Sequence, residues 1–272
     1  MPELPSSHIS SSTAIDVLIP AIEKDLNTLP YVIDGVRRFV RHPIGTVYIV
    51  SPGGSAGIRR LCASKGCKFV DEALVLPLSK KDIHYRSSRW ERSGWLLQQL
   101  LKLSGDRICQ RKHFLVIDAD TVLIRPHTFL TKGKTVYYYR SWSQPEYFRT
   151  HRKLLGKGVS APHSFVSHYM LFDRDKLSRL KRTIEDRHGI AWFKAILRSI
   201  DKTKQFGFSE FETYGNFHYA ERPGEILFRH TLNKSLPLKA SSLSAAKVRL
   251  LARKYRSLSF HQRKGYTRTP KE

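Results

Sequence analysis

The apolar positions in the first part of the chain alternate between two spacings. Short, nearly continuous apolar runs are typical of strands that are buried on both faces. The segments between them place apolar side chains three and four residues apart, which is typical of helices. Strand, helix, strand, helix, strand predicts a parallel sheet with crossover helices. The predicted strands span residues 15–20, 46–50 and 68–70. The predicted helices lie within residues 24–40, with Asn27 or Thr28 as the cap and Pro30 in the first turn, and within residues 58–64.

A fourth apolar run, residues 114–117, leads directly into Asp118, Ala119 and Asp120. An amphipathic segment, residues 90–103, comes before it and is predicted to be a helix. Carboxylates at the end of a buried strand are costly unless positive charge compensates them, and open α/β sheets bind ligands at this edge. A divalent cation bridging to a phosphate is one explanation, and a turn with solvated aspartates is the other.

The second half of the chain continues the mixed pattern. Residues 135–139 and 164–173 are predicted strands, and residues 173–187 and 190–200 are predicted helices. A further helix begins near residue 209, with Ser209 as its N-cap and Glu212 as the reciprocal partner in a capping box. Glu212 therefore has a structural explanation, whereas Glu210 has a weaker one.

The C-terminal part of the chain is basic. Residues 244–258 show a helical pattern in which Val248, Leu251, Ala252 and Tyr255 form one face and basic residues the other. Such a helix is suited to docking on anionic lipid or on the domain itself. We therefore divide the chain into a loose leader, residues 1–13, a main domain, residues 14–235, and a basic helical tail, residues 236–272.

The formal net charge of +25 over 272 residues implies an anionic partner, which could be a nucleic acid, a membrane surface or a phosphorylated substrate. The sequence contains no recognised nucleic-acid-binding module, so nucleic acid is not the expected partner. Because no apolar run could span a bilayer and no secretory signal precedes residue 14, a cytoplasmic protein is expected, with possible peripheral binding at the inner face of the plasma membrane.

Arginines cluster just before the predicted helix that ends near residue 103. Arg86 and Arg89 could place positive charge beside the carboxylates or beside a bound diphosphate. A solvated basic face explains the same residues equally well.

Several of these segments, in this order, resemble one known group of proteins. Residues 17–20, 95–101, 114–121, 164–173 and 208–217 are similar to the bacterial DUF6492 family and, more broadly, to nucleotide-sugar glycosyltransferases of the GT-A type. The resemblance covers roughly residues 14–235. It implies an α/β fold with a mixed, mostly parallel sheet flanked by helices, a metal ion held by an Asp-x-Asp motif, and a nucleoside diphosphate as the leaving group.

The resemblance also implies roles for particular residues. Asp118 and Asp120 match the metal motif, with Mn²⁺ or Mg²⁺ as the ion. His168, Glu210 and Glu212 occupy positions that line a sugar pocket, and Glu210 followed by His168 are the candidates for a general base. His261 could be a third metal ligand, with Lys264 near the phosphates, and His230 is the competing third ligand.

The expected function is therefore a metal-dependent glycosyltransferase. It would move a sugar from a nucleoside-diphosphate sugar to a glycan or lipid-linked acceptor, in cell-surface polysaccharide synthesis. The alternative is a non-catalytic protein that binds an anionic ligand, either a nucleic acid or a glycan. A nucleotidyltransferase would need a glycine-rich phosphate loop after the first strand, and residues 20–23 do not provide one.

Overall fold

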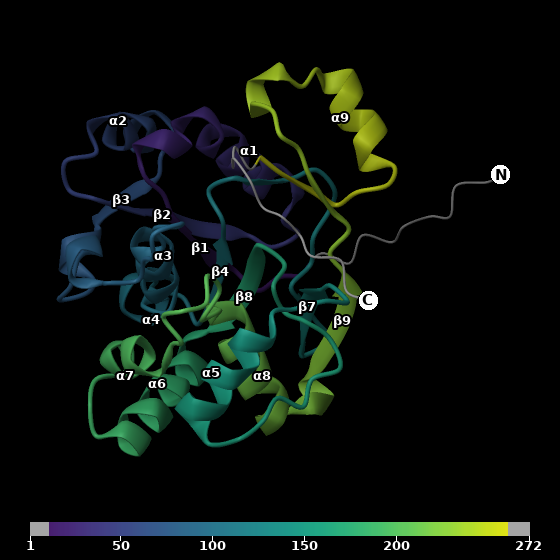
Figure 1. The fold of residues 1–272 in the computed structure, drawn as a ribbon. Helices are drawn as coiled ribbons and strands as arrows, with labels where there is room; N and C mark the ends of the chain where they lie inside the picture. The colour runs from purple at the N-terminus through teal and green to yellow at the C-terminus, as the bar shows by residue number, and fades with distance from the viewer. Residues whose placement is uncertain (1–10, 261–272) are drawn as a thin grey trace.

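A computed structural model describes residues 11–260 of the chain. A five-stranded sheet in the order β3-β2-β1-β4-β8 forms its centre (Figure 1). β4 lies between β1, which is parallel to it, and β8, which is antiparallel. The strands are β1 (Ile15–Pro20), β2 (Ile44–Ser51), β3 (Lys68–Asp71), β4 (His113–Ile117) and β8 (Tyr169–Asp173).

Helices cover both faces of this sheet. One apolar core packs α1 and α2 against it, and the other packs α3, α6, α7 and α8. Figure 1 shows α1 and α2 on one side of the sheet and α5 to α8 on the other. The helices are α1 (Leu29–Phe39), α2 (Ala56–Ser64), α3 (Ser93–Lys102), α4 (Gly105–Ile108), α5 (Pro145–Leu155), α6 (Arg174–His188), α7 (Trp192–Ser199) and α8 (Glu210–Glu221).

Two three-stranded sheets extend the molecule beyond the central sheet. One has the order β6-β7-β9, with β6 (Leu130–Thr131), β7 (Lys134–Tyr139) and β9 (Ile226–His230). The other has the order β10-β11-β5, with β5 (Thr121–Leu123), β10 (Asn233–Ser235) and β11 (Ser257–Ser259). The second sheet joins the C-terminal segment to the strand that directly follows Asp120.

The structure corrects two predicted elements. The C-terminal helix, α9, spans only Ala245–Ala252, because residues 257–259 form β11 and pair with β5. The strand predicted over residues 164–173 begins at Tyr169, because His168 adopts a left-handed backbone with φ of 69° that interrupts the extended chain. In the described part of the chain, no helix is long and apolar enough to cross a membrane.

Candidate active site

The acidic motif forms the turn between β4 and β5. The Asp118 amide donates to the His168 carbonyl at 2.9 Å, and the Thr121 amide donates to the Asp118 carbonyl at 3.1 Å. These bonds hold the C-terminal end of β4 against the residue that comes before β8. The sequence prediction of a strand that delivers two aspartates to the sheet edge is therefore confirmed.

A buried lysine lies between two carboxylates at this edge. The Lys102 ammonium, at the last residue of α3, contacts Oδ1 of Asp118 and lies 2.7 Å from Oε1 of Glu210, at the first residue of α8. The Lys102 and Glu210 side chains are each only 4% exposed, and that of Asp118 is 20% exposed. We call Lys102, Asp118, Glu210 and His168 the charge cluster.

The three charged groups of this cluster shift one another's pKa values. Burial raises the pKa of Asp118, but the Lys102 charge and His168 outweigh it and hold that pKa well below its usual range. Burial lowers the pKa of Lys102, but the two carboxylates outweigh it and raise that pKa above its usual range. Burial raises the pKa of Glu210, and the Lys102 charge only partly opposes this. One lysine therefore faces two carboxylates, of which Asp118 is held ionised and Glu210 is shifted toward its neutral form.

His168 completes the cluster with a strained backbone. Its Nδ1 lies 3.0 Å from Oδ2 of Asp118. A positive φ is uncommon for a residue with a β-carbon, and such strain gathers at functional sites. By contrast, the left-handed C-caps of α5 and α6 are glycines, Gly156 and Gly189. A histidine in this conformation is consistent with a functional role for its ring.

Glu212 lies in α8, two residues after Glu210. The prediction that it is the capping-box partner of Ser209 was wrong. Ser209 does cap α8, because its hydroxyl accepts from the Glu212 amide at 3.2 Å. The Glu212 carboxylate instead accepts from Ser164, from Ser143 at 2.6 Å and from Asn216 at 3.2 Å. Burial raises its pKa, although the two serine hydroxyls oppose the shift. Glu212 therefore ties the start of α8 to the segments that contain residues 143 and 164.

Asp120 is fixed by the C-terminal segment. Its carbonyl accepts from the Phe260 amide at 2.9 Å, and its Oδ1 lies 3.3 Å from the Thr121 hydroxyl. The nearby Asp25 has a raised pKa, mainly because it is buried and further because of the charges of Asp120 and Asp118. Negative potential therefore extends from the charge cluster across the motif to the residues before α1.

The remaining predicted residues lie elsewhere or outside the described range. Arg86 and Arg89 come before α3 and are exposed, and of the described contacts none joins either to Asp118. His230 lies on β9, where its Nε2 is 2.7 Å from the Tyr139 hydroxyl. His261 and Lys264 fall outside residues 11–260. Among residues 11–260, no group of three or more His, Cys, Asp or Glu side chains is arranged to hold a metal ion.

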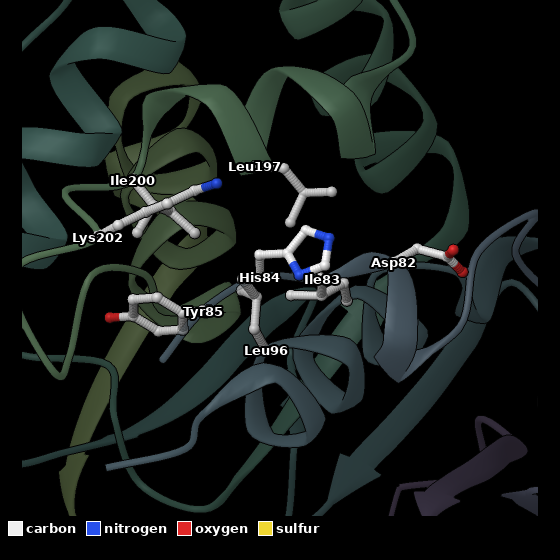
Figure 2. Close-up of a pocket in the computed structure, with 8 residues that line it drawn as sticks. All are labelled: Asp82, Ile83, His84, Tyr85, Leu96, Leu197, Ile200 and Lys202. Carbon is white, nitrogen blue, oxygen red and sulfur yellow. The ribbon is translucent and has the colours of Figure 1, made fainter. Parts of the chain in front are cut away.

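A separate cavity of about 80 Å³ lies between residues 82–85, α3 and α7. Figure 2 shows His84 and Lys202 among the residues that line it, together with the apolar Leu96 and Leu197. Pockets that hold small-molecule ligands are typically about 300–1,000 Å³. This cavity is too small for a nucleotide sugar, so it does not compete with the charge cluster as the candidate site.

Comparison with known proteins places the chain in a family. A model described as "Family of unknown function (DUF6492)" matches residues 13–247. The chain belongs to the DUF6492 family. No curated protein matches its sequence.

Solved structures show the fold of this DUF6492 chain. It is similar to "WbbM bifunctional glycosytransferase apo structure" with a TM-score of 0.50 and 13% identity, over 94% of this chain and 47% of that one. The chain thus spans about half the length of WbbM. It is also similar to the galactosyltransferase LgtC in complex with donor and acceptor sugar analogs, with a TM-score of 0.45 and 13% identity over 90% of this chain and 87% of LgtC. Mouse xyloside xylosyltransferase 1 gives a TM-score of 0.46 and 16% identity over 96% of this chain and 100% of the enzyme. The predicted GT-A-like fold is confirmed.

Lys102 is the site residue that sequence reasoning missed. A lysine in the last turn of a helix usually faces solvent and interacts favourably with the helix C-terminus. Its two partners lie 16 and 108 residues away in the sequence. The only available signal was that Lys102 is the one charged residue of α3, a helix that comes before β4 in the chain.

Proposed function

We propose that this DUF6492 chain is a glycosyltransferase that moves a sugar from a nucleoside-diphosphate sugar to a hydroxyl of a glycan or lipid-linked acceptor. Synthesis of a cell-surface polysaccharide on the cytoplasmic side of the membrane is the setting that we propose. The observation that carries the proposal is the charge cluster and its position, next to an Asp-x-Asp turn at the strand end of a GT-A-like sheet. In open α/β sheets this edge is where ligands bind.

The donor atoms at this edge fit Mn²⁺ or Mg²⁺. Both ions prefer oxygen ligands, and Mg²⁺ is commonly held by one or two carboxylates while waters and substrate phosphates fill the other positions. Asp118 and Asp120 would hold the ion, and the low pKa of Asp118 keeps its carboxylate ionised. Bound there, a divalent cation would stabilise negative charge on the departing diphosphate. His261 remains the proposed third ligand, with Lys264 beside the phosphates.

The other residues of the cluster would position the donor sugar. Lys102 fixes the Asp118 and Glu210 carboxylates relative to each other, so both are preorganised before a ligand binds. Glu210 is the first candidate to orient a sugar hydroxyl or to accept the proton of the acceptor, and His168 is the second. Glu212 is engaged by three side chains, so we assign it a positioning role at the start of α8.

A ligand screen tests this function. The full chain would be melted with a panel of nucleoside diphosphates and nucleotide sugars, with and without Mn²⁺. We expect one nucleoside diphosphate to raise the melting temperature in the presence of Mn²⁺, because a ligand at about 100 times its dissociation constant adds about 2.7 kcal/mol. The matching nucleotide sugar should then be hydrolysed slowly, or transferred when an acceptor is present.

The screen also has outcomes that contradict the proposal. If no nucleotide stabilises the chain but oligosaccharides do, the chain is a glycan-binding protein without the transfer reaction. If nucleotides stabilise the chain equally with and without Mn²⁺, the proposed nucleotide-sugar site stands and the proposed metal site is wrong.

A further inference from the structure

The segment that leads into Phe260 is strongly and exclusively basic. Between Arg229 and Phe260 the sequence contains eight basic residues and no acidic one. They are Arg229, Lys234, Lys239, Lys247, Arg249, Arg253, Lys254 and Arg256. Such a concentration of positive charge attracts an anionic partner.

The structure shows which face of α9 is available to that partner. Val248, Leu251 and Ala252 pack inward against a small core that contains Ile124, Leu258 and Phe260, together with other residues of the same segment. The apolar face predicted for this helix is therefore used within the protein. The outward face presents Arg249, Leu250 and Arg253, and Leu250 is 55% exposed. We call this outward face, with the exposed Lys247 and Lys254 beside it, the α9 surface.

An apolar groove of about 180 Å³ lies on the inward side of α9. It lies between α1, β5 and the C-terminal segment, and its lining includes Val122, Ile124 and Val248. Tyr31, which is 42% exposed, and the exposed Arg38 also line it. The exposed Asp34 lines it as well, and its charge is paired with Lys65 at 2.8 Å. An apolar interior with an aromatic ring and a cation at its edge suits the boundary between water and lipid.

We propose that the α9 surface docks on a bilayer that contains anionic phospholipids. Exposed lysines and arginines are attracted to the negative surface potential of such a bilayer. The exposed Leu250 among them favours lipid over nucleic acid, because it can contact hydrocarbon. This docking does not depend on the proposed transfer reaction.

The surface is connected to the acidic motif. β11 follows α9 and pairs with β5, and the Phe260 amide bonds to the Asp120 carbonyl. If the proposed function is also correct, docking through α9 brings the metal-binding edge close to lipid-linked acceptors.

Vesicle binding tests the docking directly. The full chain would be sedimented with vesicles of phosphatidylcholine, with and without one-third phosphatidylglycerol, at low and high salt. We expect binding only to the anionic vesicles, and weaker binding at high salt. The variant Arg249→Glu with Arg253→Glu should bind at least roughly 25-fold more weakly, because each positive charge near an anionic surface strengthens binding roughly fivefold.

Two further variants sharpen the test. Lys194→Glu with Arg198→Glu makes the same charge change on exposed residues of α7, which lies away from α9 in Figure 1, and should bind within about twofold of the unmodified chain. Leu250→Asn should weaken binding roughly threefold, and the ratio should persist at high salt because the lost contact is apolar. All variants change exposed residues, so their melting temperatures serve as the folding control.

Three results would overturn the proposal. The first is an Arg249→Glu, Arg253→Glu variant that binds as tightly as the unmodified chain. The second is an equal loss in the α7 control, which would show that only total charge matters. The third is single-stranded RNA displacing the chain from anionic vesicles at equal charge concentration, which would make the surface a nucleic-acid site.

Discussion

Two buried lysines in this molecule have similar partners and different surroundings. Lys102 lies at the sheet edge between Asp118 and Glu210. Lys181, on α6, lies 2.5 Å from Asp106, on α4, whose other carboxylate oxygen accepts from Ser178 at 3.0 Å. Both ammonium groups are within bonding distance of a carboxylate, so proximity alone does not separate a site from a structural ion pair.

The balance of charge separates them. Burial lowers the pKa of Lys181, and the single charge of Asp106 does not reverse this. Two carboxylates do reverse it at Lys102. The Lys181 pair is therefore matched, one charge to one, whereas Lys102 faces two carboxylates in a cluster that also contains the strained His168. A matched pair needs no further partner, whereas a second carboxylate beside one lysine leaves oxygen atoms that can bind a cation.

The largest expected effect follows from removing Lys102. Lys102→Met leaves two buried carboxylates without their counter-charge, and we expect it to lower the free energy of unfolding by roughly 3–5 kcal/mol. Chemical denaturation monitored by circular dichroism measures this. Adding Glu210→Gln should recover part of the loss, because it removes one of the uncompensated charges. No recovery in the double variant would contradict the charge-balance argument.

Removing Lys181 should cost less. Asp106 keeps its hydrogen bond from Ser178, so we expect Lys181→Met to lower the free energy of unfolding by roughly 2–3 kcal/mol. Nucleoside diphosphate binding, measured by calorimetry below the melting temperature, should be unchanged. If Lys181→Met and Lys102→Met weaken nucleoside diphosphate binding equally, the two pairs do not differ in function.

Acid should destabilise the protein through histidines outside both pairs. Burial lowers the pKa of His127 to about 3 and those of His151 and His218 to about 4. An unfolded histidine binds a proton near pH 6.5, so their neutral forms stabilise the fold above that pH. Stability should therefore fall as the pH drops from about 6.5 toward 4, by up to about 1.4 kcal/mol per pH unit for each histidine.

Denaturation at several pH values measures this slope. His127→Gln should reduce the slope of stability against pH by the contribution of one proton, about 1.4 kcal/mol per pH unit. A variant of the exposed His84 should leave the slope unchanged. A slope that does not change in the His127 variant would contradict the assignment.

The smallest expected change in stability is at His168. His168→Gly relieves the left-handed strain but loses the contact with Asp118 and adds backbone freedom, so we expect a net change within about 1 kcal/mol. Gly189→Ala, at a left-handed helix cap, should destabilise by roughly 1–2 kcal/mol. If His168→Gly keeps full affinity for the nucleotide ligand, the strain at residue 168 serves the fold and not the site.

The fold was largely predictable because its central strands and flanking helices have strong, local hydrophobic periodicity. β1 and β2 lie close to their predicted ranges, and α1 begins directly after Thr28, one of its two predicted caps. The end of α9 was not predictable, because residues 253–258 continue a helical pattern while pairing with the distant β5 decides their structure. Long-range pairing can override a local pattern in this way.

The site was predictable only in part. Asp118 and Asp120 were identifiable because carboxylates that follow a buried strand are conspicuous. Lys102 was not, since its role depends on two partners that only the folded chain brings to it. The Glu212 carboxylate accepts from Ser143 and Ser164, which lie on separate segments far from α8 in the sequence. The prediction that Glu212 is a capping-box residue was therefore wrong.

The central claim is that the Asp118–Asp120 turn binds a metal ion and a nucleoside diphosphate. Calorimetry of the nucleoside diphosphate selected by the screen, with Mn²⁺, would compare Asp120→Asn with Asp186→Asn, which makes the same change at an exposed residue of α6. We predict that Asp120→Asn weakens metal-dependent binding by at least roughly 100-fold while the melting temperature of the free protein stays near that of the control. Equal affinity in the two variants would contradict the claim.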